Sequence, residues 1–326
     1  MRVDFAGIDV GSLRLPVTLC RDGKRVRKIF PNTPSGHRAI CRFLSVGGGM
    51  TRVCIESTGA YGLDLAIALS KYEGIEVMVA NPRAVRCFAQ ALLQRNKTDR
   101  IDADVLEQFA TRMPFQPWHA PSSSALQLRA IARRLDALTL AATAEKNHLH
   151  AACLCQQTPQ VIRKDIQESI ARLTQSIRTL TTQALTIIRA DPLLKKRFDL
   201  AITVPGIAQT SAIRILGELA GLPPDMDARQ WVALAGLDPR HHISGTAVHK
   251  KPRLSKAGNR YLRTALYMPA LTARRHNLTL KTFADRLIAH GKTPMQTLGA
   301  LMRKLLVLLH AIFRKNQPFS LNPQQT

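Results

Sequence analysis

Several features that are common in proteins are scarce in this sequence. Aromatic residues make up 5% of its 326 residues, which argues against a broad stacking platform for single-stranded nucleic acid. We expect Trp118 and Trp231 to act as packing anchors instead. The six cysteines include no Cys-x-x-Cys pair, so we expect neither a structural zinc site nor a disulfide framework. The cysteine pattern therefore indicates a reducing cytoplasm.

The sequence also lacks a long uninterrupted apolar run. Asp4 and Asp9 interrupt the N-terminal stretch, which excludes a signal peptide. The last apolar segment, near residues 298–313, contains Arg303 and Lys304 and is too short to span a bilayer. We therefore expect no contact with a membrane.

Acidic residues are absent from one long segment. Between Pro239 and Ala284 the sequence has ten Lys and Arg but no Asp or Glu. The whole chain carries a formal net charge of +25, and its pI is about 10.8. A surface that is merely soluble mixes both signs, so this segment favours a polyanion, most simply nucleic acid. The candidate phosphate contacts are Arg240, Lys250, Lys251, Arg253, Lys256, Arg260 and Arg263.

Carboxylates, by contrast, cluster in the N-terminal part. Asp9 and Glu56 lie in apolar stretches that predict strands, and Asp99 and Asp102 open a predicted helix. Asp99 and Asp102 share one helical face, whereas Asp104 points roughly 140° away from Asp99, so we expect Asp104 to be nearly dispensable. Four oxygen ligands from two strands and a helix suit a pair of Mg²⁺ ions, which would stabilise both oxygens exchanged in phosphoryl transfer.

Each carboxylate also has a structural interpretation. Glu56 could cap the following helix, and Asp99 with Asp102 could be a favourable pair at a helix N-terminus. The string from Gly7 to Ser12 is also seen at the first phosphate loop of actin-like sugar kinases, although no Gly-rich adenosine loop follows it. Four purely structural carboxylates are the least favoured interpretation, because like charges that are brought together repel.

The N-terminal residues alternate between predicted strands and helices. Three strands in succession, followed by alternating helices and strands, predict a mixed α/β domain over residues 1–115. Its predicted strands are 3–10, 14–20, 25–30, 52–56 and 75–80, and its predicted helices are 35–45, 60–72, 82–93 and 100–112.

The rest of the chain predicts helices. Residues 122–190 follow a heptad pattern, broken at Thr158-Pro159, that predicts a two-helix coiled-coil hairpin or a dimer arm, with an ordinary helical bundle as the alternative. Residues 195–317 predict a mostly α-helical domain with a loop at 236–258, and residues 318–326 predict a disordered tail. In that domain, Pro205-Gly206 predicts the turn of a helix-hairpin-helix, whose N–H groups would face a phosphate.

Motifs in both halves resemble one family. Three motifs resemble the N-terminal domain of DEDD-type insertion-sequence transposases, which are related to the Piv DNA invertases. They are Gly7-Ile8-Asp9-Val10, Glu56-Ser57-Thr58-Gly59 and Lys97-Thr98-Asp99-Arg100-Ile101-Asp102-Ala103. The second domain of that family is similar to Val204-Pro205-Gly206-Ile207, Ala235-Gly236-Leu237-Asp238-Pro239 and Ser244-Gly245. The resemblance covers nearly the whole chain, in the right order.

The resemblance implies an RNase H-like (RuvC-like) N-terminal fold and DNA recombination by a serine nucleophile. The acidic tetrad maps onto Asp9, Glu56, Asp99 and Asp102, where two Mg²⁺ ions are expected, and the nucleophile maps onto Ser244. The family further implies a structured guide RNA, encoded by the element, that pairs with both target and donor DNA. We also expect double-stranded DNA as the substrate, a dimer or tetramer, and a cytoplasmic, nucleoid-associated location in a bacterium.

Ser244 is harder to argue from chemistry alone. A serine hydroxyl is a weak nucleophile without a base or a metal, so without the resemblance Ser244 is an ordinary turn residue. The cations around it would hold a scissile phosphate. Two other functions remain open: a hydrolytic RuvC-like nuclease of the Holliday-junction resolvase type, in which Ser244 is inert, and a non-catalytic nucleic-acid-binding protein. A covalent protein–DNA adduct distinguishes a serine recombinase from both.

Overall fold

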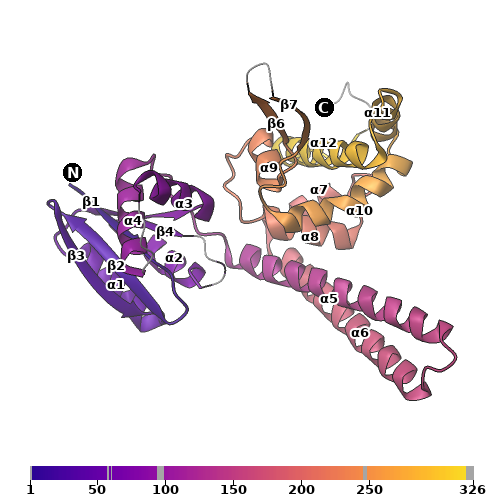
Figure 1. Cartoon of the computed structure of the whole chain (residues 1–326), viewed down its shortest axis with the longest axis horizontal. Helices are drawn as coiled ribbons and strands as arrows, with labels where there is room; N and C mark the ends of the chain where they lie inside the picture. Colours follow the sequence, from indigo (N-terminus) through magenta and orange to yellow (C-terminus); the bar gives the residue numbers. More distant parts are fainter. Residues whose placement is uncertain (1, 57–58, 60, 94–98, 245–247, 321–326) are drawn as a thin grey trace. The chain divides into compact units, whose positions relative to one another are not determined.

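The structure is a computed structural model that describes residues 2–56, 59, 61–93, 99–244 and 248–320. For residues 99–100, 241–244 and 248–252 it describes the backbone alone. The chain forms two compact units, Met1–Ala120 and Pro121–Thr326 (Figure 1). The first unit is mixed α/β and the second is mostly helical, as the sequence predicts.

A five-stranded sheet with the order β3-β2-β1-β4-β5 forms the centre of the first unit. Strands β1, β4 and β5 are parallel, and β2 is antiparallel to both β1 and β3. The strands are β1 Val3–Ile8, β2 Arg14–Arg21, β3 Lys24–Pro31, β4 Met50–Glu56 and β5 Ile75–Ala80. All five predicted strands are confirmed.

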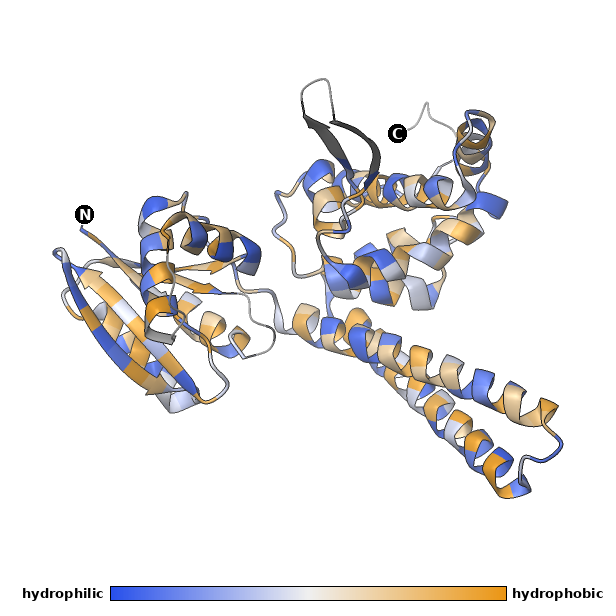
Figure 2. Ribbon diagram, in the orientation of Figure 1, coloured by the Kyte–Doolittle hydropathy of each residue, from blue (hydrophilic) through white to orange (hydrophobic). Residues whose placement is uncertain are grey.

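Helices cover both faces of this sheet. They are α1 Pro34–Ser45, α2 Leu63–Ser70, α3 Pro82–Ala91 and α4 Asp99–Arg112. On one face, Ile8 and Ile55 pack with Leu44 of α1 and Leu65 of α2. On the other face, Cys54 packs with residues of α3 and α4. The central strands are therefore apolar on both sides, as buried parallel strands must be, whereas the edge strand β3 is mainly hydrophilic (Figure 2).

Two long helices form the arm of the second unit. Helix α5 spans Ser123–Leu154 and α6 spans Gln160–Ala190, and the two pack side by side (Figure 1). Pro159 precedes α6 as its N-cap residue, so the predicted break is confirmed. The arm also joins the main core, because Leu128 and Ile188 belong to the apolar cluster that the other helices share. Of the alternatives, a hairpin folded within one chain is observed.

In the described part of the second unit, six further helices surround the core. They are α7 Pro192–Ile202, α8 Gln209–Leu219, α9 Ala228–Ala235, α10 Arg260–His276, α11 Leu278–Ala289 and α12 Pro294–Lys315. Helices α7 and α8 form the predicted helical pair. Gly206 in their turn has a φ of +104° and lies against α10, where a Cβ would come within 2.8 Å of the Pro269 carbonyl oxygen. Close packing accounts for this glycine.

The predicted loop at 236–258 is wrong. Strands β6 Pro239–Ser244 and β7 Val248–Leu254 form an antiparallel hairpin there. The usual sign of a strand is alternation of apolar and polar residues. This segment has mainly His, Lys and Arg instead, so the periodic signal is missing although the strands are present.

Helix α12 is longer than the predicted apolar segment. In the described part of the chain it is the one helix long and apolar enough, by length and composition, to cross a membrane. Leu301, Leu305 and Leu309 are nevertheless fully buried in the core of the second unit, as in an amphipathic core helix. After α12, the N–H of Phe319 donates to Thr203 Oγ1 over 2.9 Å. The predicted tail is thus attached at its start, and residues 321–326 lie outside the described residues.

Candidate functional site

The first candidate site is the edge of the sheet at which β1 and β4 end. The two strands pair in parallel up to their last apolar residues, and Asp9 and Glu56 occupy the next position on each. Neighbouring strands lie about 4.8 Å apart. Because side chains alternate along a strand, Asp9 lies on the same face as Gly7, and Glu56 on the same face as Cys54, which is the face that α4 covers.

Helix α4 brings Asp102 to the same edge. A Cβ on Gly7 would overlap the backbone of α4 at Ala103 and Glu107, so only glycine allows the helix to approach β1 this closely. Asp102 is half-buried in the first turn of α4. It lies one turn before Leu106, which is buried against the sheet. Asp102 is therefore on the sheet side of the helix.

The fourth carboxylate, Asp99, is the first residue of α4, and its side chain lies outside the described part. Among the side chains that are described, no three His, Cys, Asp or Glu lie close enough to hold a metal ion together. Cys54 is beside this edge, where burial, with the charge of Glu56 adding to it, raises the pKa of the thiol to about 12. Cys54 therefore stays neutral and is not a nucleophile.

Ion pairs with β3 fix the position of α4. Arg27 donates to the Asp104 carboxylate from Nε over 2.9 Å and from Nη2 over 2.8 Å, and Thr18 Oγ1 donates to it over 2.7 Å. Arg25 Nε donates over 2.9 Å to the buried Glu107. Burial raises the pKa of Asp104, but the bonds from Arg27 and Thr18 outweigh burial and lower the pKa overall. Asp104 points away from the acidic edge, as predicted, but it holds the helix and is not dispensable.

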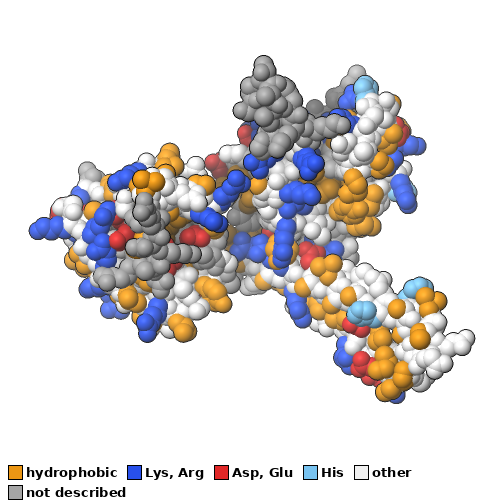
Figure 3. All heavy atoms as spheres, in the orientation of Figure 1, with side chains coloured by type: hydrophobic (Ala, Val, Ile, Leu, Met, Phe, Trp, Pro, Cys, Tyr) orange, Lys and Arg blue, Asp and Glu red, His pale blue; other side chains and the backbone are white. Residues whose placement is uncertain are grey.

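The second candidate site is the β6–β7 hairpin. Arg240 lies opposite Arg253 in the ladder, and Ser244, the last residue of β6, lies opposite Val248. The hairpin residues whose side chains are not described include Ser244, Lys250 and Lys251. Both arginines are exposed, and like charges that face each other destabilise a ladder, so an anion between them would stabilise the hairpin. Lys and Arg are also spread over much of the face in Figure 3.

The base of the hairpin is fastened to the end of α9. Ser255 Oγ donates to Asp238 Oδ1 over 2.6 Å, and Arg263 Nη1 donates to the Ala235 carbonyl oxygen over 2.9 Å. Arg263 is half-buried, so part of its guanidinium has a structural role beside the predicted phosphate contact. Lys256 is exposed and has a φ of +51°, so it lies at a tight turn of the backbone.

A buried carboxylate joins the arm to the start of α10, which the sequence did not reveal. Glu218 is 6% exposed and accepts hydrogen bonds from Arg133 over 2.7 and 2.9 Å and from Asn259 Nδ2 over 2.6 Å. Asn259 caps α10 by accepting from the N–H of Tyr261 over 2.9 Å. The next residue, Arg260, is exposed and lies 4.9 Å from the Tyr261 ring. The hydrogen bonds of Glu218 and Asn259 therefore fix the start of α10, where Arg260, a predicted phosphate contact, lies.

Comparisons with known proteins agree with the resemblance. A family profile for the DEDD domain of IS110 elements, described as "Transposase", matches residues 6–159, and one described as "Transposase IS116/IS110/IS902 family" matches residues 198–285. A pilin gene-inverting protein of Moraxella bovis is 30% identical over 324 residues, 98% of either chain. The chain belongs to the IS110/IS116/IS902 transposase family. A pilin gene-inverting protein of Moraxella lacunata is 30% identical over 267 residues, 81% of this chain and 80% of the relative.

A more distant relative of this transposase is a protein of insertion element IS110 from Streptomyces coelicolor. It is 26% identical over 157 residues, 48% of this chain and 38% of the relative. The two profile matches divide the candidate sites between them: the first contains the acidic edge and the second contains the hairpin and α10. As a member of this family, the transposase is a DNA-rearranging enzyme, so a non-catalytic binding protein is no longer a candidate.

Proposed function

We propose that the first unit of this insertion-sequence transposase is an RNase H-like domain whose acidic edge binds two Mg²⁺ ions through Asp9, Glu56, Asp99 and Asp102. The observation that carries the proposal is that Asp9 and Glu56 share one face at the ends of adjacent parallel strands, beside the first turn of α4. The strand order β3-β2-β1-β4-β5 supports the fold assignment.

The ligand chemistry of this edge fits magnesium. Mg²⁺ prefers oxygen ligands and is commonly held by one or two carboxylates, with water and substrate phosphates completing its shell. Binding of Mg²⁺ thus does not require three protein ligands around one ion. The described side chains do not form such a group by themselves. When bound, the ions would stabilise charge on the attacking and leaving oxygens. The ion pairs of Asp104 and Glu107 support the proposal, because they hold in place the helix that carries Asp102.

We further propose that Ser244 is the nucleophile. Its Oγ forms a bond to the phosphorus of a DNA phosphodiester, one P–O bond of the DNA breaks, and the released DNA oxygen ends as a hydroxyl with the proton that the serine has lost. The phosphoserine ester keeps the bond energy, so attack by another DNA hydroxyl can rejoin strands without an external energy source. Arg240 and Arg253, which lie opposite each other on the same hairpin, support the proposal, because guanidinium groups bind phosphate oxygens.

Other macromolecules complete this proposal. The substrate is DNA, in double-stranded form, and a structured guide RNA encoded by the element selects the sites. A net charge of +25 supports binding of large polyanions. Exchange of two duplexes needs two catalytic centres, so the active form is a dimer or tetramer. The cytoplasmic, nucleoid-associated location stays a prediction.

A trapped intermediate tests this mechanism. Labelled DNA carrying the element's junction is incubated with the transposase, guide RNA and Mg²⁺, denatured and resolved on a gel. We expect protein covalently attached to a DNA end, with mass spectrometry of the digest locating the phosphate on Ser244. Cleaved DNA with no attached protein would instead support the hydrolytic nuclease, in which the carboxylates activate water and Ser244 is inert.

A further inference from the structure

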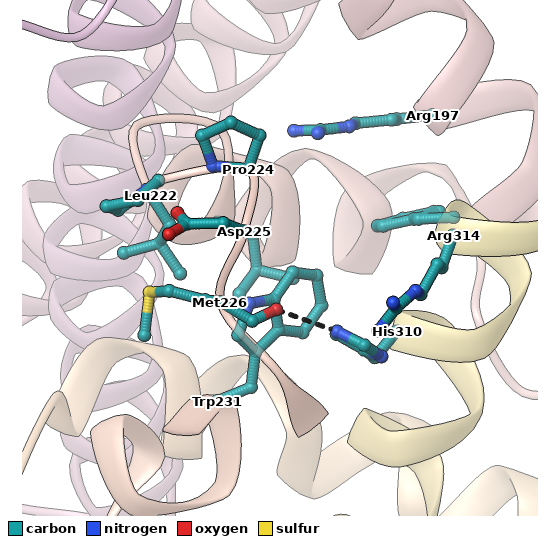
Figure 4. Close-up of a pocket in the computed structure, with 11 residues that line it drawn as sticks. Arg197, Leu222, Pro224, Asp225, Met226, Trp231, His310 and Arg314 are labelled. Atoms are coloured by element: carbon teal, nitrogen blue, oxygen red, sulfur yellow. Dashed lines mark hydrogen bonds between the residues drawn. The ribbon is translucent and has the colours of Figure 1, made fainter. Parts of the chain in front are cut away.

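The second unit contains a cavity that neither candidate site uses. Its volume is about 290 Å³, near the lower limit for small-ligand sites. It lies between α7, the α8–α9 connection and the last turns of α12, and its wall includes Arg197, Asp225, Trp231, His310 and Arg314 (Figure 4). These residues come from three separate stretches of the sequence, so no single motif marks the cavity.

The aromatic side of the cavity is held in place by ring packing and by one hydrogen bond. The Trp231 ring packs edge-on against the His310 ring, with 4.9 Å between centroids. His310 Nε2 is held by the Met226 carbonyl oxygen over 2.9 Å. Trp231 is 7% exposed, and its indole N–H has no hydrogen-bond partner among the described residues.

The cavity carries charges of both signs on different walls. Arg197 and Arg314 come from α7 and α12, and Asp225 lies on the connection before α9 (Figure 4). All three side chains line the cavity, and among the ion pairs of the described residues none joins Asp225 to either arginine. Arg197 is half-buried and its guanidinium lies 6.0 Å from the Phe313 ring. The basic surface continues next to the cavity with exposed Lys195 and Lys196, which line a neighbouring open pocket.

We propose that this cavity binds one unpaired nucleotide of a single-stranded nucleic acid segment. Arg197 and Arg314 would hold its phosphate, and the Asp225 carboxylate would accept from an amino group on its base. Lys195 and Lys196 would bind the neighbouring phosphates, which a free mononucleotide does not have. The inference deepens the proposed function, because it rests on nucleic acid being bound by the second unit. Unpaired nucleotides occur in DNA opened for strand exchange and in the loops of a structured RNA.

Trp231 provides a direct probe of occupancy. The chain has two tryptophans, so Trp118→Phe leaves Trp231 as the single indole fluorophore of the full-length protein. Short labelled oligo(dC), oligo(dT) and oligo(rC) and a duplex of equal length are titrated, with anisotropy reporting binding and tryptophan emission reporting the cavity. We expect single strands to change the emission and the duplex to bind without doing so. Oligo(dC) should bind more tightly than oligo(dT), because only cytosine offers an amino donor. The DNA and RNA arms identify which strand is preferred.

Substitutions inside and outside the cavity test whether single strands bind there. Arg197→Gln should weaken binding of oligo(dC) by about tenfold. Arg303→Gln, which removes the same charge three turns before Arg314 on α12 and away from the cavity, should have less than about a twofold effect. Asp225→Asn should reduce the preference for oligo(dC) over oligo(dT) without lowering the affinity for oligo(dT).

The possible outcomes distinguish failure of the cavity proposal from failure of the proposed nucleic-acid role of the second unit. If single strands bind by anisotropy but the emission of Trp231 does not change, and Arg197→Gln behaves as Arg303→Gln does, the cavity proposal is overturned while the proposed nucleic-acid role stands. If neither strands nor duplex bind, the nucleic-acid role of the second unit fails together with the cavity. Equal emission changes with the duplex and with single strands would also overturn the preference for an unpaired nucleotide.

Discussion

At the scale of single residues, the proposed metal site separates carboxylates that are expected to bind Mg²⁺ from carboxylates that hold α4 against the sheet. Asp102→Asn removes one oxygen charge from the sheet side of α4 without changing its shape. We expect recombination to fall by about a hundredfold or more, as when a charge-stabilising group is removed, with DNA affinity and thermal stability nearly unchanged. Recombination assays and DNA-binding assays on the same preparation check this, and full activity would remove Asp102 from the metal site.

A suitable control for that variant is Glu73→Gln. Glu73 is exposed and precedes β5, so it lies at the opposite edge of the sheet from Asp9 and Glu56. The neighbouring Asp104, although off the acidic face, is unsuitable because its carboxylate is bonded to Arg27 and Thr18.

The serine prediction also needs a well-chosen control. Ser244→Ala is expected to abolish both the protein–DNA adduct and recombination while DNA binding remains, because the nucleophilic oxygen is removed. Ser255 looks equivalent in the sequence, but its hydroxyl bonds to Asp238 at the base of the hairpin, so its removal would loosen the site. Ser176→Ala, at an exposed position of α6, is the better control. An adduct that persists in Ser244→Ala would exclude this nucleophile.

At the scale of secondary-structure elements, the attachment of α4 to the sheet can be measured as stability. The pKa of Asp104 is lower in the folded protein, so its stabilising contribution is complete above the ordinary aspartate pKa of about 3.9 and is lost as pH falls through the folded value. Because Arg27 and Asp104 are partly exposed, we expect Asp104→Asn to cost about 1 kcal/mol at neutral pH. Urea unfolding should show this difference at pH 7 and a smaller difference near pH 3. An equal difference at both pH values would contradict the ion-pair explanation.

The hairpin makes a prediction about salt. Replacing Lys250, Lys251 and Arg253 with Ala should lower the slope of log affinity against log salt concentration by roughly one unit for each DNA phosphate that the protein no longer neutralises. The same triple substitution should weaken binding to different DNA sequences about equally, because phosphate contacts do not read sequence. A slope equal to that of the wild type would place the binding surface elsewhere.

Local sequence patterns predict some of these elements, whereas the contacts between residues far apart in the sequence leave no such pattern. Continuous apolar runs predict β1 and β4, and a polar residue that ends such a run predicts the acidic edge, because both signals are local. The bonds of Arg25 and Arg27 to Glu107 and Asp104 join residues that are 82 and 77 positions apart, and nothing local indicates the pairing. The hairpin was missed because its strands contain mainly cationic residues and histidines and do not alternate apolar with polar residues. Ser244 stays a prediction that rests on the resemblance alone.

At the scale of the whole molecule, the structure shows which positions of the arm can test self-association. Leu135 and Leu138 looked like seam positions of a dimer arm, but both are 4% exposed within one chain, so charged substitutions there would damage the fold. Exposed apolar side chains on the arm are better targets: Leu140, Leu154 and Val161 are 70%, 73% and 68% exposed. If the arm mediates self-association, Leu154→Asp with Val161→Asp should lower the mass in light scattering while circular dichroism stays unchanged. An unchanged mass would leave the arm as an intramolecular hairpin.

The junction of Glu218 with Arg133 and Asn259 has a consequence for evolution. Without Arg133, Glu218 would keep, among the described residues, only the bond from Asn259, and a buried polar group with an unmade hydrogen bond costs about 1–3 kcal/mol, a substantial part of the stability of most domains. Substitution of Arg133 alone is therefore expected to be eliminated by selection, whereas joint replacement of Arg133 and Glu218 by apolar residues can be close to neutral. Descendants of this sequence should thus change Arg133 and Glu218 together or not at all. A change at Asn259 should follow, because Asn259 would then cap α10 without its hydrogen bond to the carboxylate.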